Sequence, residues 1–90
     1  MGPDDKVVHD APLPPYRQLA EILRARVQRG DWLPNKPLPS ELQLAGTYDV
    51  ARGTVRRAIG LLIEDGILFT VPHRGTYVSE RGHRKEAPTP

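Results

Sequence analysis

Residues 40–58 read SELQLAGTYDVARGTVRRA, and this stretch decides the fold. Ser40 precedes Gln43 by three positions, which is the spacing of a helix capping box, so a helix should run from about residue 40 to 47. Tyr48-Asp49-Val50 interrupts the helical pattern, and another helix should begin at about residue 52. The stretch therefore predicts two helices joined by a short turn.

The joint between these two helices meets the packing requirements of a helix-turn-helix. A small residue is needed where the first helix touches the second, and Ala45 supplies it. The turn then needs a residue that tolerates a left-handed φ, and Asp49 is one of the few residue types besides glycine that does. Apolar residues follow at the positions that should face the core: Val50, Val55 and Ala58.

Upstream, residues 15–29 carry the pattern of an amphipathic helix. Its apolar residues recur at helical spacing: Tyr16, Leu19, Ala20, Ile22, Leu23 and Val27. Pro15 suits the first turn of this helix and Gly30 its C-terminal end. The three prolines of residues 31–39 exclude a further helix, and we expect Trp32 and Leu33 in this segment to contact the core.

Downstream, the helix that begins at about residue 52 should continue to residue 65. Residues 67–71 and 76–78 are rich in strand formers, with Pro72-His73-Arg74-Gly75 between them as a hairpin tip. The expected fold is α+β, mostly α: a winged helix-turn-helix of three helices followed by a β-hairpin wing, over residues 15–79. Residues 1–14 should form a flexible tail that packs against nothing, and residues 80–90 a flexible basic tail.

The exposed face of the helix at 52–65 is basic near its N-terminal end. Arg52 and Arg56 lie one turn apart and should project together, and the planar guanidinium suits guanine O6 and N7 in the major groove of DNA. Arg57 lies further round and should meet a phosphate, as should the Thr54 hydroxyl. The competing interpretation is that these arginines only keep an exposed face soluble.

The composition excludes several other classes of protein. Ninety residues make one domain, and the absence of cysteine excludes disulfides and thiolate metal sites. We expect no catalytic site, metal or cofactor, because Ser40 should be occupied as a helix cap and His9, His73 and His83 are scattered. There is no apolar run long enough for a membrane span and no signal peptide, so a cytoplasmic location is expected. Residues 51–90 carry seven basic and four acidic side chains, a balance that suits a phosphate backbone.

Residues 15–79 resemble the N-terminal winged-helix domain of GntR-type, or gluconate-repressor-like, bacterial regulators. The matching segments are YRQLAE at 16–21, LPSE at 38–41, VARGTVRRA at 50–58, LLIEDGIL at 61–68 and RGTYV at 74–78. The resemblance implies a transcription regulator, usually a repressor, that binds double-stranded DNA at an inverted-repeat operator, with two copies forming a dimer on it. The DNA-binding residues then expected are Ser40, Arg52, Gly53, Thr54, Arg56, Arg57, His73, Arg74 and Gly75.

The sequence departs from the family pattern at four positions in or next to this set of residues. Leu42 stands where the family commonly has an arginine that reaches DNA, so that contact should be lost. Ala51 replaces a capping serine and cannot cap a helix. Gly53 stands where a hydroxyl residue is frequent, and His73 replaces a common glycine of the wing. A sequence preference that is weaker than, or different from, that of a typical family member is expected.

Two other functions fit parts of the sequence. A winged helix can serve as a protein-protein interaction module, although its recognition face then tends to be apolar or acidic. The basic residues at 81–86 could bind an anionic membrane, but they have no apolar face beside them. Family members also continue into an effector-binding domain. This chain should lack one, being either a naturally minimal regulator or a shortened piece of a longer one.

Overall fold

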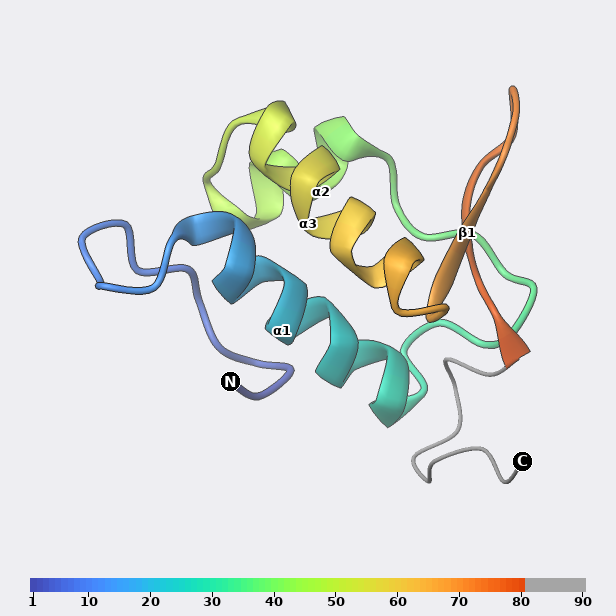
Figure 1. Cartoon of the computed structure of the whole chain (residues 1–90), viewed down its shortest axis with the longest axis horizontal. Coiled ribbons are helices and arrows are strands. Elements are labelled where there is room, and N and C mark those ends of the chain that lie inside the picture. The colour runs from blue at the N-terminus through green and yellow to red at the C-terminus, as the bar shows by residue number, and fades with distance from the viewer. Residues whose placement is uncertain (81–90) are drawn as a thin grey trace.

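The computed structural model describes residues 1–80 and contains three helices followed by an antiparallel hairpin (Figure 1). The helices are α1 at Pro15–Arg29, α2 at Glu41–Tyr48 and α3 at Arg52–Glu64. The strands are β1 at Leu68–Val71 and β2 at Gly75–Val78. The predicted winged helix-turn-helix is confirmed, and every helix boundary lies within one residue of its predicted position.

Local signals in the sequence account for the helix ends. Gly30 ends α1 in the left-handed region at φ 92°, and Asp49 ends α2 at φ 54°, as the turn requires. The Ser40 hydroxyl accepts a hydrogen bond from the Gln43 backbone, and the Gln43 side chain accepts one from the Ser40 backbone. The capping box is therefore complete. Ala51 begins α3 without a side-chain cap, as expected.

The core lies between α1 and α3 and is closed on one side by the base of the hairpin. Its fully buried large side chains are Leu19, Ile22, Leu23, Val27, Leu44, Val55, Leu62, Leu68 and Val78. Trp32 packs against this core as expected, and Arg26 stacks on its ring at 4.3 Å. The expectation for Leu33 was wrong, because this side chain is 55% exposed. The chain turns beside it, with the Lys36 amide bonded to the Leu33 carbonyl, so only one of the two neighbours faces inward.

The hairpin pairs Leu68 with Val78 at its base and Val71 with Gly75 at its tip. Arg74 donates its backbone N–H to the Val71 carbonyl at 3.0 Å, which closes a tight turn with Pro72 and His73 at its centre. His73 has φ 64°. Proline followed by a positive φ is the pattern of a type II turn, in which glycine is the favoured residue at the second central position. His73 therefore occupies a glycine-type conformation, and Gly75 already belongs to β2 rather than to the tip.

The segment between α1 and α2 runs beside β2, which the sequence did not reveal (Figure 1). Pro37 forms an isolated bridge with Tyr77, and Leu38 donates its N–H to the Thr76 carbonyl at 2.8 Å. The prolines of this segment lack the N–H groups that a regular strand would use, which explains why only a bridge forms. This segment fixes the base of the hairpin next to the start of α2.

The expectation of an unpacked tail over residues 1–14 was wrong. Val7 is buried in the core cluster. The buried Gln18 side chain accepts a hydrogen bond from the Val8 N–H and donates one to the Val8 carbonyl, so it holds the segment against α1. A polar side chain supplies this attachment, and no hydrophobic periodicity would have indicated it. Of the second predicted tail, residues 81–90 lie outside the described residues.

Candidate nucleic-acid interface

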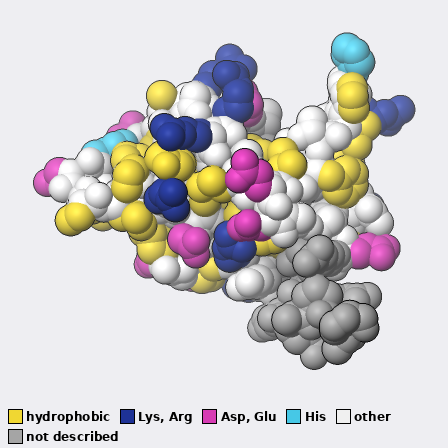
Figure 2. Space-filling model, viewed as in Figure 1, with side chains coloured by type: hydrophobic (Ala, Val, Ile, Leu, Met, Phe, Trp, Pro, Cys, Tyr) yellow, Lys and Arg dark blue, Asp and Glu magenta, His cyan; other side chains and the backbone are white. Residues whose placement is uncertain are grey.

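Helix α3 has one buried and one exposed face. Its buried side chains are Val55, Ala58, Ile59 and Leu62, which include the predicted Val55 and Ala58. Arg52, Arg56 and Arg57 all lie on the exposed side, and the Arg52 and Arg56 side chains are 59% and 66% exposed. Figure 2 shows basic side chains gathered over the part of the molecule that carries the helices, with acidic groups interspersed. The helix thus presents guanidinium groups outward from a fixed apolar base.

Glu41, on the first turn of α2, holds the two leading arginines of α3. Arg56 donates from Nε and a terminal nitrogen to the two Glu41 carboxylate oxygens, at 3.1 and 3.0 Å. A terminal nitrogen of Arg52 lies 3.6 Å from the same carboxylate. The hydrogen bond from Arg56 lowers the pKa of Glu41, with a further contribution from Arg52, and the pKa of Arg56 is raised in turn. The carboxylate is therefore ionised at neutral pH and orients both arginines.

Arg57 is oriented by a different helix. Its guanidinium lies over the ring of Tyr16, on the first turn of α1, at 4.0 Å from the ring centroid. Arg17 approaches the same ring at 5.6 Å. A cation is attracted to the face of an aromatic ring at such distances. Tyr16 thus gathers two positive charges at the N-terminal end of α1, beside α3.

The wing and the start of α2 enclose a groove of about 470 Å³. Its residues come from the first turn of α2, from α3 and from the hairpin: Pro39, Ser40, Glu41, Leu42, Arg52, Ile59, Thr70, Val71, Pro72, His73, Arg74, Gly75 and Thr76. Figure 2 shows the hairpin projecting from the body with a histidine at its tip and a basic side chain near it. The groove is open to solvent and lies between the first turn of α2 and the wing.

The predicted DNA-binding residues do not all meet in one place. The groove brings together Ser40, Arg52, His73, Arg74 and Gly75. The lining of the groove does not include the other four. Gly53 is exposed and Thr54 half-buried at the start of α3, Arg56 is tied to Glu41, and Arg57 lies against Tyr16.

Two residues of this surface were missed from the sequence, Glu41 and Tyr16, whereas Leu42 was noted there only as a lost contact. Glu41 and Arg56 are fifteen residues apart, and they meet only because the turn folds α2 across α3. The acidic residue at the start of α2 was a usable signal for Glu41, because the first turns of both helices lie on one side of a helix-turn-helix. No comparable sequence signal indicated the contact of Tyr16 with Arg57, since a tyrosine at this spacing is equally typical of a core position.

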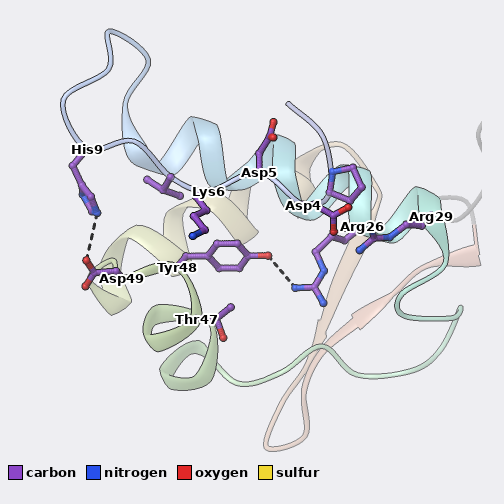
Figure 3. A pocket seen from close by; sticks show the side chains of 11 residues that line it. Asp4, Asp5, Lys6, His9, Arg26, Arg29, Thr47, Tyr48 and Asp49 are labelled. Atoms are coloured by element: carbon purple, nitrogen blue, oxygen red, sulfur yellow. Dashed lines mark hydrogen bonds and ion pairs between the residues drawn. The ribbon is translucent and has the colours of Figure 1, made fainter.

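A second hollow, of about 560 Å³, lies between the N-terminal segment, α1 and the helix-turn-helix turn (Figure 3). Its polar groups are largely engaged with one another. Arg26 donates to the Tyr48 hydroxyl at 2.9 Å, Arg29 to Asp4 at 2.9 Å, and His9 lies 4.0 Å from Asp49. In Figure 3 the dashed Arg26–Tyr48 and His9–Asp49 contacts join α1 and the N-terminal segment to the end of α2. The contacts around this hollow therefore fasten the N-terminal segment, α1 and the end of α2 together.

Residues 1–80 contain no cluster of three or more histidine and carboxylate side chains that could hold a metal ion. No helix within the same range is both long and apolar enough to cross a membrane.

Comparison with known proteins gives one consistent result. The family described as "Bacterial regulatory proteins, gntR family" matches residues 15–78. The HTH-type transcriptional repressor NagR of Bacillus subtilis (strain 168) is 39% identical over 70 residues, which cover 78% of this chain and 29% of the relative. The Mannosyl-D-glycerate transport/metabolism system repressor MngR of Escherichia coli (strain K12) is 42% identical over 67 residues, which cover 74% and 28%. The chain thus corresponds to less than a third of the length of these relatives.

Solved structures agree with the sequence relatives. The DNA-binding domain of AraR in complex with operator ORE1 has a TM-score of 0.72 and 37% identity, over 74% of this chain and 82% of that chain. A GntR family transcriptional regulator from Listeria monocytogenes has a TM-score of 0.75 and 29% identity, over 82% and 67%. The arrangement of three helices and a wing is therefore shared with a domain that was solved on its operator.

Proposed function

The chain belongs to the gntR family of bacterial regulatory proteins, and from that premise we propose that it binds a double-stranded operator and represses transcription. One observation carries the proposal: Arg52 and Arg56 project together from the exposed start of α3, whose other face is fixed in the core. The second helix of a helix-turn-helix enters the major groove with its N-terminal residues toward the bases. Operator DNA bound to AraR, at 37% identity, supports the same class of partner here.

The proposed division of labour follows from the chemistry of each group. Arg52 and Arg56 read guanine edges, because a planar guanidinium can donate two parallel hydrogen bonds to O6 and N7. Arg57, Arg74 and the hydroxyls of Ser40 and Thr54 meet phosphates and set the register of the protein on the duplex. Gly53 and Gly75 allow the backbone to approach the DNA. A Cβ would meet no protein atom within 4 Å at either position, but Gly75 has φ 122°, which itself favours glycine. His73 meets the backbone or the minor groove from the tip of the wing.

Glu41 gives this surface a defined state before DNA binds. The carboxylate neutralises part of the charge of Arg52 and Arg56 and fixes their direction. Binding a phosphate or a guanine requires Arg56 to exchange one acceptor for another. The exchange costs the same free energy on a phosphate as on a guanine, so the contribution of Glu41 to specificity comes from the direction that it gives to the two arginines.

We further propose that two copies assemble on an inverted repeat in the cytoplasm. One winged helix covers about one half-site, and half-sites about one helical turn apart place two recognition helices on the same face of the duplex. The free chain is then monomeric or weakly dimeric. Sedimentation at micromolar concentration, with and without operator, measures this, and a tight dimer without DNA contradicts it.

Selection of bound duplexes from a random library tests DNA binding and supplies the operator. The expected result is a palindromic sequence. The affinity of the protein for it should fall steeply as the salt concentration rises, because phosphate contacts release counterions. Binding that ignores sequence, or that is insensitive to salt, contradicts the proposal. The alternative of a winged helix that binds another protein through α3 receives no support from the relatives, and the arginines of that face argue against it.

A further inference from the structure

Leu42 is the most exposed large apolar side chain among residues 1–80, at 66%. It is the second residue of α2, directly after Glu41. The helix packs on the core through Leu44 and Ala45, which are buried, so folding makes no use of the Leu42 side chain. An apolar group of this size in water gains free energy when a partner covers it.

The surroundings of Leu42 identify the partner. Leu42 lines the groove between α2, α3 and the wing, together with Arg52 and Arg74. Ile59 and Val71 add apolar surface to the same groove. Glu41 lines the groove as well and pairs with Arg52, so Arg74 is the arginine of this lining that no acidic group of the groove holds. A ligand that fits must therefore offer acceptors to the arginines and an apolar group to the leucine. Duplex DNA does both, because phosphates flank the major groove and each thymine presents its 5-methyl group within it.

We propose that Leu42 contacts the 5-methyl group of a thymine in the major groove and so specifies that base at one position of each half-site. The inference rests on the proposed function, since it needs Arg52 and the start of α3 to face the bases. A leucine side chain has no hydrogen-bonding group for a phosphate, so its contribution depends on the methyl group and not on charge. It therefore adds sequence preference without adding salt dependence.

Parallel selections from a random duplex library test the assignment, using the 90-residue chain, Leu42→Ala and Leu33→Ala. Leu33 is the matched control, because it is 55% exposed and lies in the segment between α1 and α2, outside the groove lining. The wild type and Leu33→Ala should select the same sequence, including one fixed thymine per half-site. Leu42→Ala should lose the preference at that position alone and keep the guanines.

A change in the DNA tests the same contact without altering the protein. Deoxyuridine in place of that thymine removes only the methyl group, and it should weaken wild-type binding about four-fold, the equivalent of one buried methyl. Leu42→Ala should bind the deoxyuridine duplex and the thymine duplex with the same affinity. Deoxyuridine at any other thymine should leave the ratio of the wild-type affinity to the Leu42→Ala affinity unchanged.

Three results would overturn the inference. If Leu42→Ala selects the wild-type sequence, Leu42 reads no base. If Leu42→Ala weakens every duplex alike, the leucine contacts the sugar-phosphate backbone. If the wild type and Leu33→Ala enrich no sequence at all, the proposed function itself fails and the assignment of Leu42 falls with it, whereas the first two results leave DNA binding intact.

Discussion

Arg56 and Glu41 form a two-point ion pair across the helix-turn-helix, with donor-acceptor distances of 3.1 and 3.0 Å. The pair joins the helix proposed to read DNA to the first turn of the helix that supports it. An exposed arginine would otherwise sample many rotamers, and ordering it on DNA costs free energy. On the proposed function, the Glu41 carboxylate reduces that cost in advance by holding Arg56 in one direction, and its negative charge weakens the attraction of this surface for phosphates.

Glu41→Gln should reduce the ratio of specific to non-specific affinity. Glutamine keeps an acceptor for Arg56 but removes the charge, so binding to random duplex should strengthen roughly threefold at low salt. Affinity for the selected operator should rise less or fall. Fluorescence anisotropy with both duplexes across a salt series measures the ratio. Equal gains on the two duplexes would mean that the carboxylate acts only through net charge.

Arg52→Ala and Arg56→Ala should each weaken binding to the selected operator by roughly 1–3 kcal/mol and affect random DNA much less. The reason is that a lost pair of hydrogen bonds to guanine penalises only the correct site. Competition binding on operator and random duplexes gives both values. Equal losses on both would assign the two arginines to phosphates.

Arg74→Ala should weaken binding to all duplexes alike, because Arg74 sits at the exposed end of the hairpin where the backbone of DNA would pass. The slope of log affinity against log salt should fall by about one unit. Arg74→Lys keeps the charge and should keep the slope. If Arg74→Ala and Arg74→Lys give the same slope of log affinity against log salt, the wing does not approach a phosphate.

Most of the fold was predictable because its signals are local. Three signals each act over a few residues: the capping box at Ser40, the left-handed position at Asp49 and the helical spacing of the buried residues along α3. The attachment of the N-terminal segment was not predictable, since it depends on Gln18 reaching a backbone ten residues away. The bridge between Pro37 and Tyr77 was missed for the same reason, because prolines masked a strand that forms only against β2.

The site divides in the same way. The exposure of Arg52 and Arg56 on α3 followed from helical spacing. Their common partner Glu41 lies on another helix, and its acidic position at the start of α2 was the one sequence signal for it. His73 illustrates an intermediate case. Its neighbours Pro72 and Arg74 indicated a hairpin tip. The positive φ of His73, which explains why the family commonly has glycine at this position, was known only from the geometry of the turn.

Asp31→Asn should destabilise the domain in a pH-dependent manner. Hydrogen bonds from Arg29 and then Arg26 hold the pKa of Asp31 below its ordinary range. A lowered pKa in the folded state means that the stabilisation is fully present above the ordinary aspartate pKa, about 4, and is lost as pH falls through the lowered value.

At pH 7 the substitution should therefore lower Tm by about 4–8 °C, corresponding to about 1 kcal/mol, and the difference should shrink below about pH 4. Asp10→Asn, which removes an exposed carboxylate of the N-terminal segment, is the matched control. Thermal unfolding followed by circular dichroism measures both variants. A difference in Tm that stays constant down to pH 2 would show that the loss comes from packing and not from the charge.

Tyr16 should affect DNA binding through Arg57, whose guanidinium lies 4.0 Å from the centroid of its ring. Tyr16→Leu removes the ring face without altering charge, so binding to random duplex should weaken two- to five-fold, the range expected for an exposed cation–π contact. Tyr16→Phe keeps the ring and should bind like the wild type. In an Arg57→Ala background, Tyr16→Leu should have no further effect, because the group it orients is gone. Anisotropy on one random duplex gives the affinities of the wild type, the three single variants and the double variant, and circular dichroism confirms that each variant is folded. If Tyr16→Phe loses as much as Tyr16→Leu, the hydroxyl is the contact with DNA, and the ring does not act by holding Arg57.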